Sequence, residues 1–294
     1  MRSIDERRAY IPASGAIALW STVAVAFKLA LRELTPLNLL TIAVFFSWMS
    51  LGVVLLFKQD VKSLFNVSRR SILYSAVLGL LNPLAYYWIL FAAYDRLPAQ
   101  AAQPLNYTWP LFLTLLAAPI SGKKPTGRDF LGIFISLAGV VLIAYRSGGS
   151  LDKLNSAGIA LALGSGIIWA FSWLAGTRIR IEGTLRLFLS FSTSLIVLVV
   201  IWIGRGRAVP SSSVGWISVI WVGFFEMGIT FLLWNTALER TGRPARIGNL
   251  VYLGPFISLL WISLILGETI YPATVAGLAV IISGIIIGQS QKEK

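Results

Sequence analysis

Groups that could do acid–base, metal or nucleophile chemistry are almost absent from the apolar stretches of this sequence. The chain has no His and no Cys, and Glu226 is the only carboxylate that we place near the middle of an apolar stretch. A charged carboxylate there costs roughly 2.5–3.5 kcal/mol, so we expect Glu226 to be protonated, paired or in contact with water. It is a candidate for cation binding or proton transfer, and the alternative is a hydrogen bond between helices. We expect no enzyme, no cofactor and no metal site, because the necessary residues are missing.

Polar and aromatic side chains cluster in one apolar stretch, residues 99–119. Gln103, Asn106 and Tyr107 share one helical face by their i, i+3, i+4 spacing, and Trp109 follows within a turn. An unpaired polar group in hydrocarbon costs several kcal/mol, so these side chains should face protein or water. They are candidates for binding a substrate, and the alternative is that Gln103 and Asn106 only join neighbouring helices.

Further substrate-binding candidates are amide and aromatic residues of the other apolar stretches. They are Trp20, Asn82, Tyr86, Trp169, Trp173, Trp234, Asn235 and Tyr252. Aromatic rings would suit a substrate with an apolar or aromatic side chain. Packing against lipid is the alternative for the tryptophans.

The composition predicts the elements that position these residues. The chain has 294 residues, of which 56% are apolar and 13% charged, and its mean hydropathy is +0.78. A helix needs roughly 20 mostly apolar residues to span a bilayer. Apolar runs bounded by charge, Pro and Gly predict ten spanning helices at 11–31, 36–57, 71–93, 99–119, 130–145, 157–177, 185–203, 215–238, 247–266 and 272–288.

The net charge of +13 is distributed as a membrane topology requires. With the N-terminus inside, 18 of the 25 Lys and Arg residues fall in the inner segments and six fall in the outer ones. The positive-inside rule therefore predicts that both termini are cytoplasmic. The charge needs no nucleic-acid partner, and we expect none.

Several features recur at an offset of about 145 residues. Five matches need no gap: Tyr107 with Tyr252, Pro110 with Pro255, Gly122 with Gly267, Gly132 with Gly277, and Gly139 with Gly284. At an offset of 144, Asn82 corresponds to Glu226. We predict a first repeat at 1–148 and a second at 149–294. Because each repeat holds an odd number of spans, the second must enter the membrane inverted, and two inverted repeats predict transport by alternating access.

The two five-helix halves, with Leu266-Gly267-Glu268-Thr269 at the last turn, resemble the EamA branch of the drug/metabolite transporter (DMT) superfamily. Three strings resemble the aromatic amino-acid exporters of that branch: Leu19-Trp20-Ser21-Thr22, Asn106-Tyr107-Thr108-Trp109-Pro110 and Trp234-Asn235. The resemblance implies a multi-pass protein of the cell inner membrane that exports amino acids, with aromatic ones favoured. Its partners would be a small-molecule substrate and the lipid bilayer, and the sequence leaves the oligomeric state open.

Two modes of transport follow from the residues. Asn82, the counterpart of Glu226, cannot titrate, and no histidine completes a proton relay, so we expect a facilitator driven by the substrate gradient. The alternative is a drug or cation efflux carrier coupled to protons through Glu226, with tryptophans that supply cation–π contacts.

Overall fold

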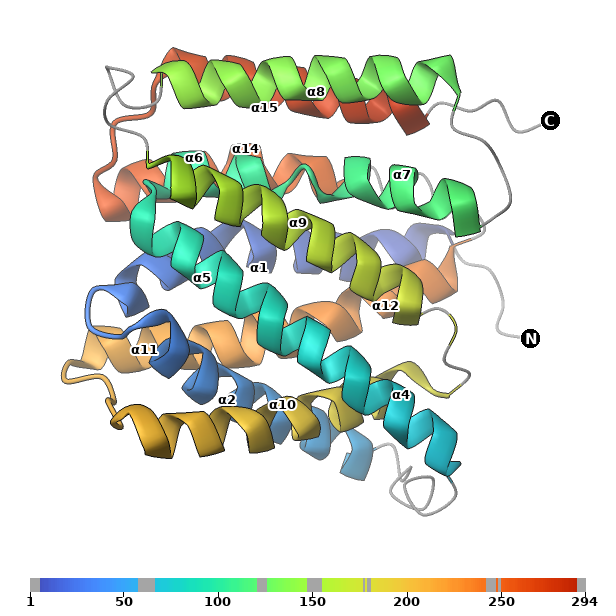
Figure 1. Ribbon diagram of the computed structural model, residues 1–294, viewed down its shortest axis with the longest axis vertical. Coiled ribbons are helices and arrows are strands. Elements are labelled where there is room, and N and C mark those ends of the chain that lie inside the picture. The colour runs from blue at the N-terminus through green and yellow to red at the C-terminus, as the bar shows by residue number, and fades with distance from the viewer. Residues whose placement is uncertain are drawn as a thin grey trace. The chain divides into compact units, whose positions relative to one another are not determined.

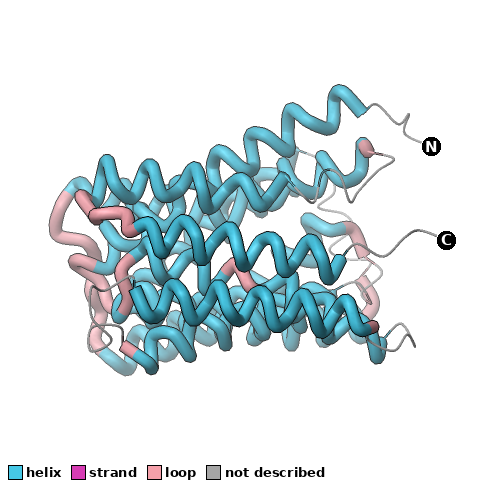
Figure 2. Tube along the Cα trace, turned by 90° about the horizontal axis from the view of Figure 1, so that it is seen from above, coloured by secondary structure: helices cyan, strands magenta, loops and turns pink. Residues whose placement is uncertain are grey.

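The computed structural model describes residues 6–57, 67–120, 126–146, 155–176, 178, 181–241, 247 and 250–289. Every regular element in these ranges is helical, and Figure 2 shows helices joined by loops without a strand. The predicted all-α fold is confirmed for this part of the chain. The helices form two compact units: Met1–Gly79 with Ile181–Leu266 (unit 1), and Leu80–Arg180 with Gly267–Lys294 (unit 2).

Unit 1 takes its helices from both halves of the sequence. They are α1 (Glu6–Leu31), α2 (Pro36–Phe57), α4 (Arg69–Gly79), α10 (Gly183–Arg205), α11 (Ser213–Trp221), η3 (Val222–Ile229), α12 (Thr230–Arg240), η4 (Leu250–Tyr252), α14 (Leu253–Trp261) and η5 (Ile262–Leu266). α1 packs against α11, α12 and α14, while α2 packs against α10 and η3.

Unit 2 also combines both halves. Its helices are η1 (Leu80–Ala85), α5 (Tyr86–Arg96), α6 (Ala99–Asn106), α7 (Trp109–Ile120), α8 (Gly127–Arg146), α9 (Ser156–Gly176) and α15 (Pro272–Gln289). α9 packs against α5, α6 and α7, and Figure 1 shows α8 and α15 side by side. Each unit therefore combines segments from both predicted repeats, 1–148 and 149–294. The repeats were predicted from sequence matches, and they stay a prediction.

A helix or a run of consecutive helices lies at each of the ten predicted spans. Within the described ranges, six of these helices or runs are long and apolar enough to cross a membrane: Arg8–Leu31, Pro36–Phe57, Arg69–Arg96, Ser156–Gly176, Gly183–Arg205 and Ser213–Trp234. Shorter apolar helices cover Phe130–Ile143, Leu250–Leu266 and Pro272–Gly288. The predicted span 99–119 is divided between α6 and α7. Pro110 explains the division. Proline has no N–H group to donate to the carbonyl oxygen of Asn106, four residues earlier, and its ring clashes with that carbonyl group.

α8 and α15 approach each other closely through glycines. A Cβ atom on Gly132 would lie 2.5 Å from the carbonyl oxygen of Gly284, and one on Gly139 would lie 2.6 Å from that of Gly277. Between these contacts, the Ser136 hydroxyl donates to the carbonyl oxygen of Ile281 at 3.1 Å. This stripe of small residues lets the two helix backbones approach closely.

A carboxylate joins two loops at one end of unit 1. Glu33 follows α1 and accepts hydrogen bonds from the backbone N–H and hydroxyl groups of Ser211 and Ser212. Ser212 also caps α11 by accepting from the N–H of Gly215 at 3.0 Å. These hydrogen bonds, with the Ser212 hydroxyl contributing most, lower the pKa of Glu33 from 4.5 to about 2.

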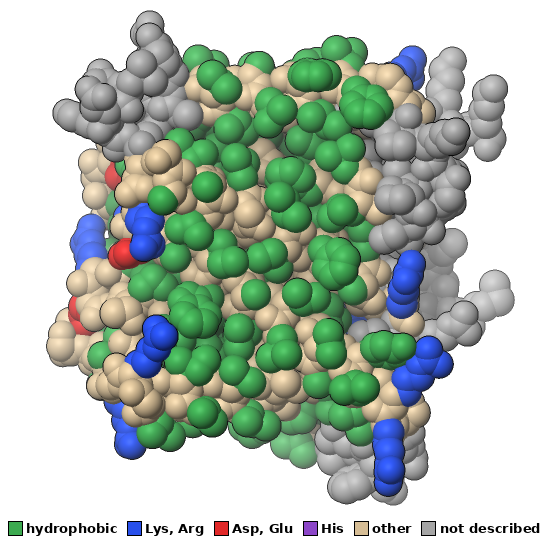
Figure 3. Space-filling view, viewed as in Figure 1, with side chains coloured by type: hydrophobic (Ala, Val, Ile, Leu, Met, Phe, Trp, Pro, Cys, Tyr) green, Lys and Arg blue, Asp and Glu red, His purple; other side chains and the backbone are tan. Residues whose placement is uncertain are grey.

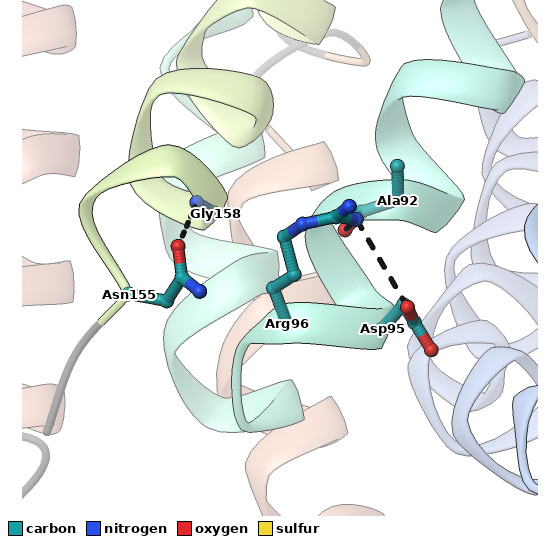
Figure 4. A network of polar contacts seen from close by, with 5 residues as sticks. All are labelled: Ala92, Asp95, Arg96, Asn155 and Gly158. Atoms are coloured by element: carbon teal, nitrogen blue, oxygen red, sulfur yellow. Dashed lines mark hydrogen bonds and ion pairs between the residues drawn. The ribbon is translucent and has the colours of Figure 1, made fainter.

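Unit 2 has comparable polar contacts at its helix ends. Glu268 accepts from the N–H groups of Ala99 and Gln100 at 2.9 and 3.1 Å, which caps the start of α6. Figure 4 shows Asn155 capping α9 through the N–H of Gly158, next to Arg96, which donates to a carbonyl oxygen of α5. Such contacts satisfy backbone groups where the apolar helices end.

The exposed surface is apolar along the helices. Figure 3 shows hydrophobic side chains across the middle of the helices, with Lys and Arg near their ends. Large exposed apolar side chains occur in both units, including Phe57, Ile196 and Val200 in unit 1 and Phe134 and Val141 in unit 2. Such a surface is stable in lipid and would aggregate in water.

Candidate functional site

One face of α9 organises the polar and aromatic candidates of unit 2. Ser165, Trp169 and Ser172 lie at i, i+4 and i+7, so they share this face, and all three are buried. Each serine hydroxyl donates to a carbonyl oxygen three residues earlier, which leaves its oxygen free to accept. The face therefore presents two hydrogen-bond acceptors, one on either side of an indole ring.

Asn106, the last residue of α6, bonds to two other helices. Its amide nitrogen donates to the Ser165 hydroxyl at 2.9 Å, and its amide oxygen accepts from the Tyr86 hydroxyl at 3.3 Å. Only 7% of Asn106 is exposed. The side chain thus ties the α6–α7 break to α9 and to the first turn of α5.

Asn82 bonds to the second serine. Its amide nitrogen donates to the Ser172 hydroxyl at 3.4 Å. Asn82 has extended dihedral angles, φ −144° and ψ 114°, in the middle of an otherwise helical segment. Discontinuous helices release backbone groups that can bind polar ligands in transporters. Two helix breaks, at 82 and at 107–108, therefore meet the same face of α9.

Aromatic rings surround Trp169. Its ring centroid lies 4.9 Å from that of Tyr86, 6.1 Å from that of Trp109 and 6.2 Å from that of Trp173. These separations fall in the range of favourable aromatic pairs. Trp109 and Trp173 are half-buried, so the cluster has rings that a ligand can reach.

Gln103 lies one helical turn before Asn106 and is 2% exposed. Neither its amide nitrogen nor its amide oxygen has a hydrogen-bond partner among the described residues. Tyr107 is half-buried at the break that follows.

The cluster contains no charged side chain. Among the described side chains of unit 2, the charged ones are Asp95, Arg96, Arg128, Arg178 and Glu268, and all lie in turns or at helix ends. Amides, hydroxyls and rings therefore supply its chemistry, which suits a ligand of zero net charge.

Unit 1 brings together a second group of predicted residues. The Trp20 ring lies 5.3 Å from that of Trp234 and 6.1 Å from that of Phe231. The hydroxyls that follow Trp20 accept from indole N–H groups: Ser21 from Trp261 at 3.2 Å, and Thr22 from Trp221 at 3.0 Å. These contacts hold α1 against α11, α12 and α14.

The other predicted residues of unit 1 are Glu226, Tyr252 and Asn235. Glu226 is 7% exposed and lies in the π-helical segment η3, and Tyr252 is buried in η4. The side chain of Asn235 lies outside the described residues.

Several contacting residues did not stand out in the sequence. Ser165 and Ser172 looked like ordinary small residues of an apolar helix, and only their i, i+7 spacing around Trp169 marks them. Glu33 lies in a short loop, and its serine partners lie 178 and 179 residues away. In the described part of the chain, no group of three or more His, Cys, Asp or Glu residues could hold a metal ion.

A sequence model of the EamA-like transporter family matches residues 7–145 and 156–288. The chain belongs to this family. It is therefore a membrane transporter of the EamA type within the DMT superfamily, as the sequence strings indicated.

Relatives of this EamA transporter include proteins of known and unknown substrate. The aromatic amino acid exporter YddG of Ancylobacter novellus is 26% identical over 63% of this chain and 64% of that protein, which is less than two thirds of its length. The uncharacterized inner membrane transporter YedA of Escherichia coli K12 is 25% identical over 95% and 91%. A protein with a solved crystal structure, 22% identical, shares the fold with a TM-score of 0.68 and 97% coverage of both chains.

Proposed function

We propose that this EamA transporter exports amino acids with aromatic or large apolar side chains across the cell inner membrane, without converting them chemically. The observation that carries the proposal is the Trp169 cluster, in which three aromatic rings surround an indole flanked by two serine-bound amides. Rings provide area for an apolar or aromatic side chain, and amides provide donors and acceptors for its polar groups. A zwitterionic amino acid has zero net charge and fits a cluster without charged side chains.

The likeness to YddG supports the same class of substrate, since that relative is an aromatic amino acid exporter. The strings Leu19-Trp20-Ser21-Thr22 and Asn106-Tyr107-Thr108-Trp109-Pro110 contribute residues to both aromatic groups described above. We assign substrate contact to Asn82, Tyr86, Asn106, Trp109, Trp169 and Trp173 in unit 2. Trp20 and Trp234 are the corresponding candidates in unit 1.

Alternating access by two inverted repeats is the proposed mechanism. The family matches two segments of similar length, 7–145 and 156–288. At the offset of 145, Gly132 corresponds to Gly277, and Gly284 corresponds to Gly139. Gly132 contacts Gly284, and the corresponding pair, Gly277 and Gly139, is also in contact. Ser136 and Ile281, bonded between these contacts, are themselves 145 residues apart. A twofold relation between repeats produces this pattern, which supports inverted halves. The excess of Lys and Arg in the inner segments supports cytoplasmic termini.

The proposed driving force is the substrate gradient. Glu226 is the one carboxylate near mid-span, and Asn82 occupies its counterpart position. We assign Glu226 to binding a substrate ammonium group or to joining helices. Its burial also favours a second candidate, a cation efflux carrier in which Glu226 exchanges protons.

Counterflow in proteoliposomes tests the substrate class. Vesicles loaded with unlabelled tryptophan should take up labelled tryptophan, and external phenylalanine or tyrosine should compete while lysine and glutamate should not. Ethidium and tetraphenylphosphonium test the second candidate in the same vesicles. Counterflow of these cations in vesicles that show no counterflow of tryptophan would reject amino-acid export in favour of cation efflux.

A further inference from the structure

α6 contains two buried glutamines one turn apart that differ in their hydrogen bonds. The Gln100 amide nitrogen donates to the carbonyl oxygen of Thr269 at 2.7 Å. Its amide oxygen accepts from the Thr274 hydroxyl at 3.1 Å and from the N–H of Tyr271 at 3.3 Å. Gln100 is 3% exposed and its polar atoms are bonded, so a structural role explains it fully.

Gln103 has the same side chain and the same burial, but neither amide atom has a partner among the described residues. A buried polar group without a hydrogen bond typically destabilises a protein by about 1–3 kcal/mol, so each such group calls for an explanation. A ligand that bonds to the amide removes this penalty when it binds. Gln103 therefore differs from a residue that only joins helices.

The position of Gln103 places it beside the Trp169 cluster. It precedes Asn106 by one turn on the same side of α6, and Asn106 bonds directly to α9 and α5. Gln100, one turn in the other direction, bonds to the residues that lead into α15. Gln103 lies between these two contacts, next to the cluster that we assign to the substrate side chain.

We propose that Gln103 is the specificity residue that recognises the amino and carboxylate groups of the substrate together. This inference rests on the proposed function, because it assigns the polar half of the same ligand. A primary carboxamide carries a donor and an acceptor in one plane. Its N–H groups donate to the substrate carboxylate, and its oxygen accepts from the substrate ammonium. An uncharged residue can bind both groups, whereas a charged one would favour one of them.

Three ligands and three variants test the assignment in the full-length purified transporter. Tryptophan has both groups, tryptamine lacks the carboxylate, and indole-3-propionate lacks the ammonium. The variants are Gln103→Met, which keeps the length of the side chain but not its amide, Gln103→Glu, which keeps only an acceptor, and the control Gln100→Met. Affinity is measured by isothermal titration calorimetry, and stability by the thermal unfolding midpoint without ligand.

The wild type should bind tryptophan more tightly than either analogue. Gln103→Met should weaken tryptophan binding about 10- to 100-fold, as expected for hydrogen bonds to charged groups, without lowering the unfolding midpoint. Gln103→Glu should invert the preference, so that tryptamine binds more tightly than tryptophan. Gln100→Met should lower the midpoint and leave tryptophan affinity within about threefold, because it removes bonds within the protein and none to the substrate.

Two results would overturn the proposal in distinguishable ways. If Gln103→Met lowers the midpoint as Gln100→Met does and tryptophan affinity and selectivity stay unchanged in both Gln103 variants, Gln103 is a structural residue and the proposed substrate class survives. If the wild type binds none of the three ligands, the proposed function itself fails, and this inference fails with it.

Discussion

Replacement of Gly139 by alanine should separate α8 from α15. The added Cβ would lie 2.6 Å from the carbonyl oxygen of Gly277, and this neighbour is backbone that cannot rotate away. Overpacking of this kind costs about 1–3 kcal/mol. Alanine also favours a helix over glycine by up to about 1 kcal/mol, which partly offsets the steric cost.

Gly164→Ala is the matched control, since Gly164 lies inside α9 and a Cβ there would meet nothing within 4 Å. The gain in helix propensity is common to both variants, so their difference isolates the steric cost. We expect Gly139→Ala to be less stable than Gly164→Ala by about 1–3 kcal/mol. Reversible unfolding in mixed detergent and dodecyl sulfate micelles measures this difference. Equal stability of the two variants would refute the close helix contact.

Three further predictions concern the site, a loop and the topology. Tyr107→Ala and Trp109→Ala should each abolish tryptophan uptake while membrane insertion stays normal, and unchanged uptake in both would place the site elsewhere. Glu33 has a lowered pKa, so its bonds to Ser211 and Ser212 should stabilise the protein fully above pH 4.5 and be lost as the pH falls through about 2. The wild type should therefore lose more stability between pH 6 and pH 3 than Glu33→Gln does, and parallel losses would contradict this. A reporter fused after Lys294 should be cytoplasmic and one inserted at 146–156 external, whereas reporters on one side would exclude inverted repeats.

The helices were largely predictable because their signal is local. Runs of apolar residues bounded by charge and glycine placed a helix at each expected position. The break between α6 and α7 was not predicted, because the apolar run 99–119 continues across it, although Pro110 explains it afterwards. The interruption at Asn82 was less predictable, because the backbone change falls on Asn82 itself, and Pro83 alone does not fix where a helix opens.

Contacts between distant segments were only partly predictable. The glycines at 132, 139, 277 and 284 stood out in the sequence, but their spacing did not show that α8 would pack against α15. The serines that bond to Asn82 and Asn106 carry no comparable signal, since serine also bonds to its own helix. The composition of the two units, with α1 packed on α11, α12 and α14, depends on tertiary contacts that periodicity does not encode.

The proposed facilitator lets aromatic amino acids move down their own gradient. The most direct measurement is the final ratio of internal to external labelled tryptophan in proteoliposomes, with and without an imposed pH gradient. The ratio should be near one in both conditions, and Glu226→Gln should change the apparent affinity but not this ratio. If tryptophan accumulates under a pH gradient, and Glu226→Gln loses this accumulation but keeps downhill exchange, the transporter is not a facilitator and Glu226 is the proton carrier.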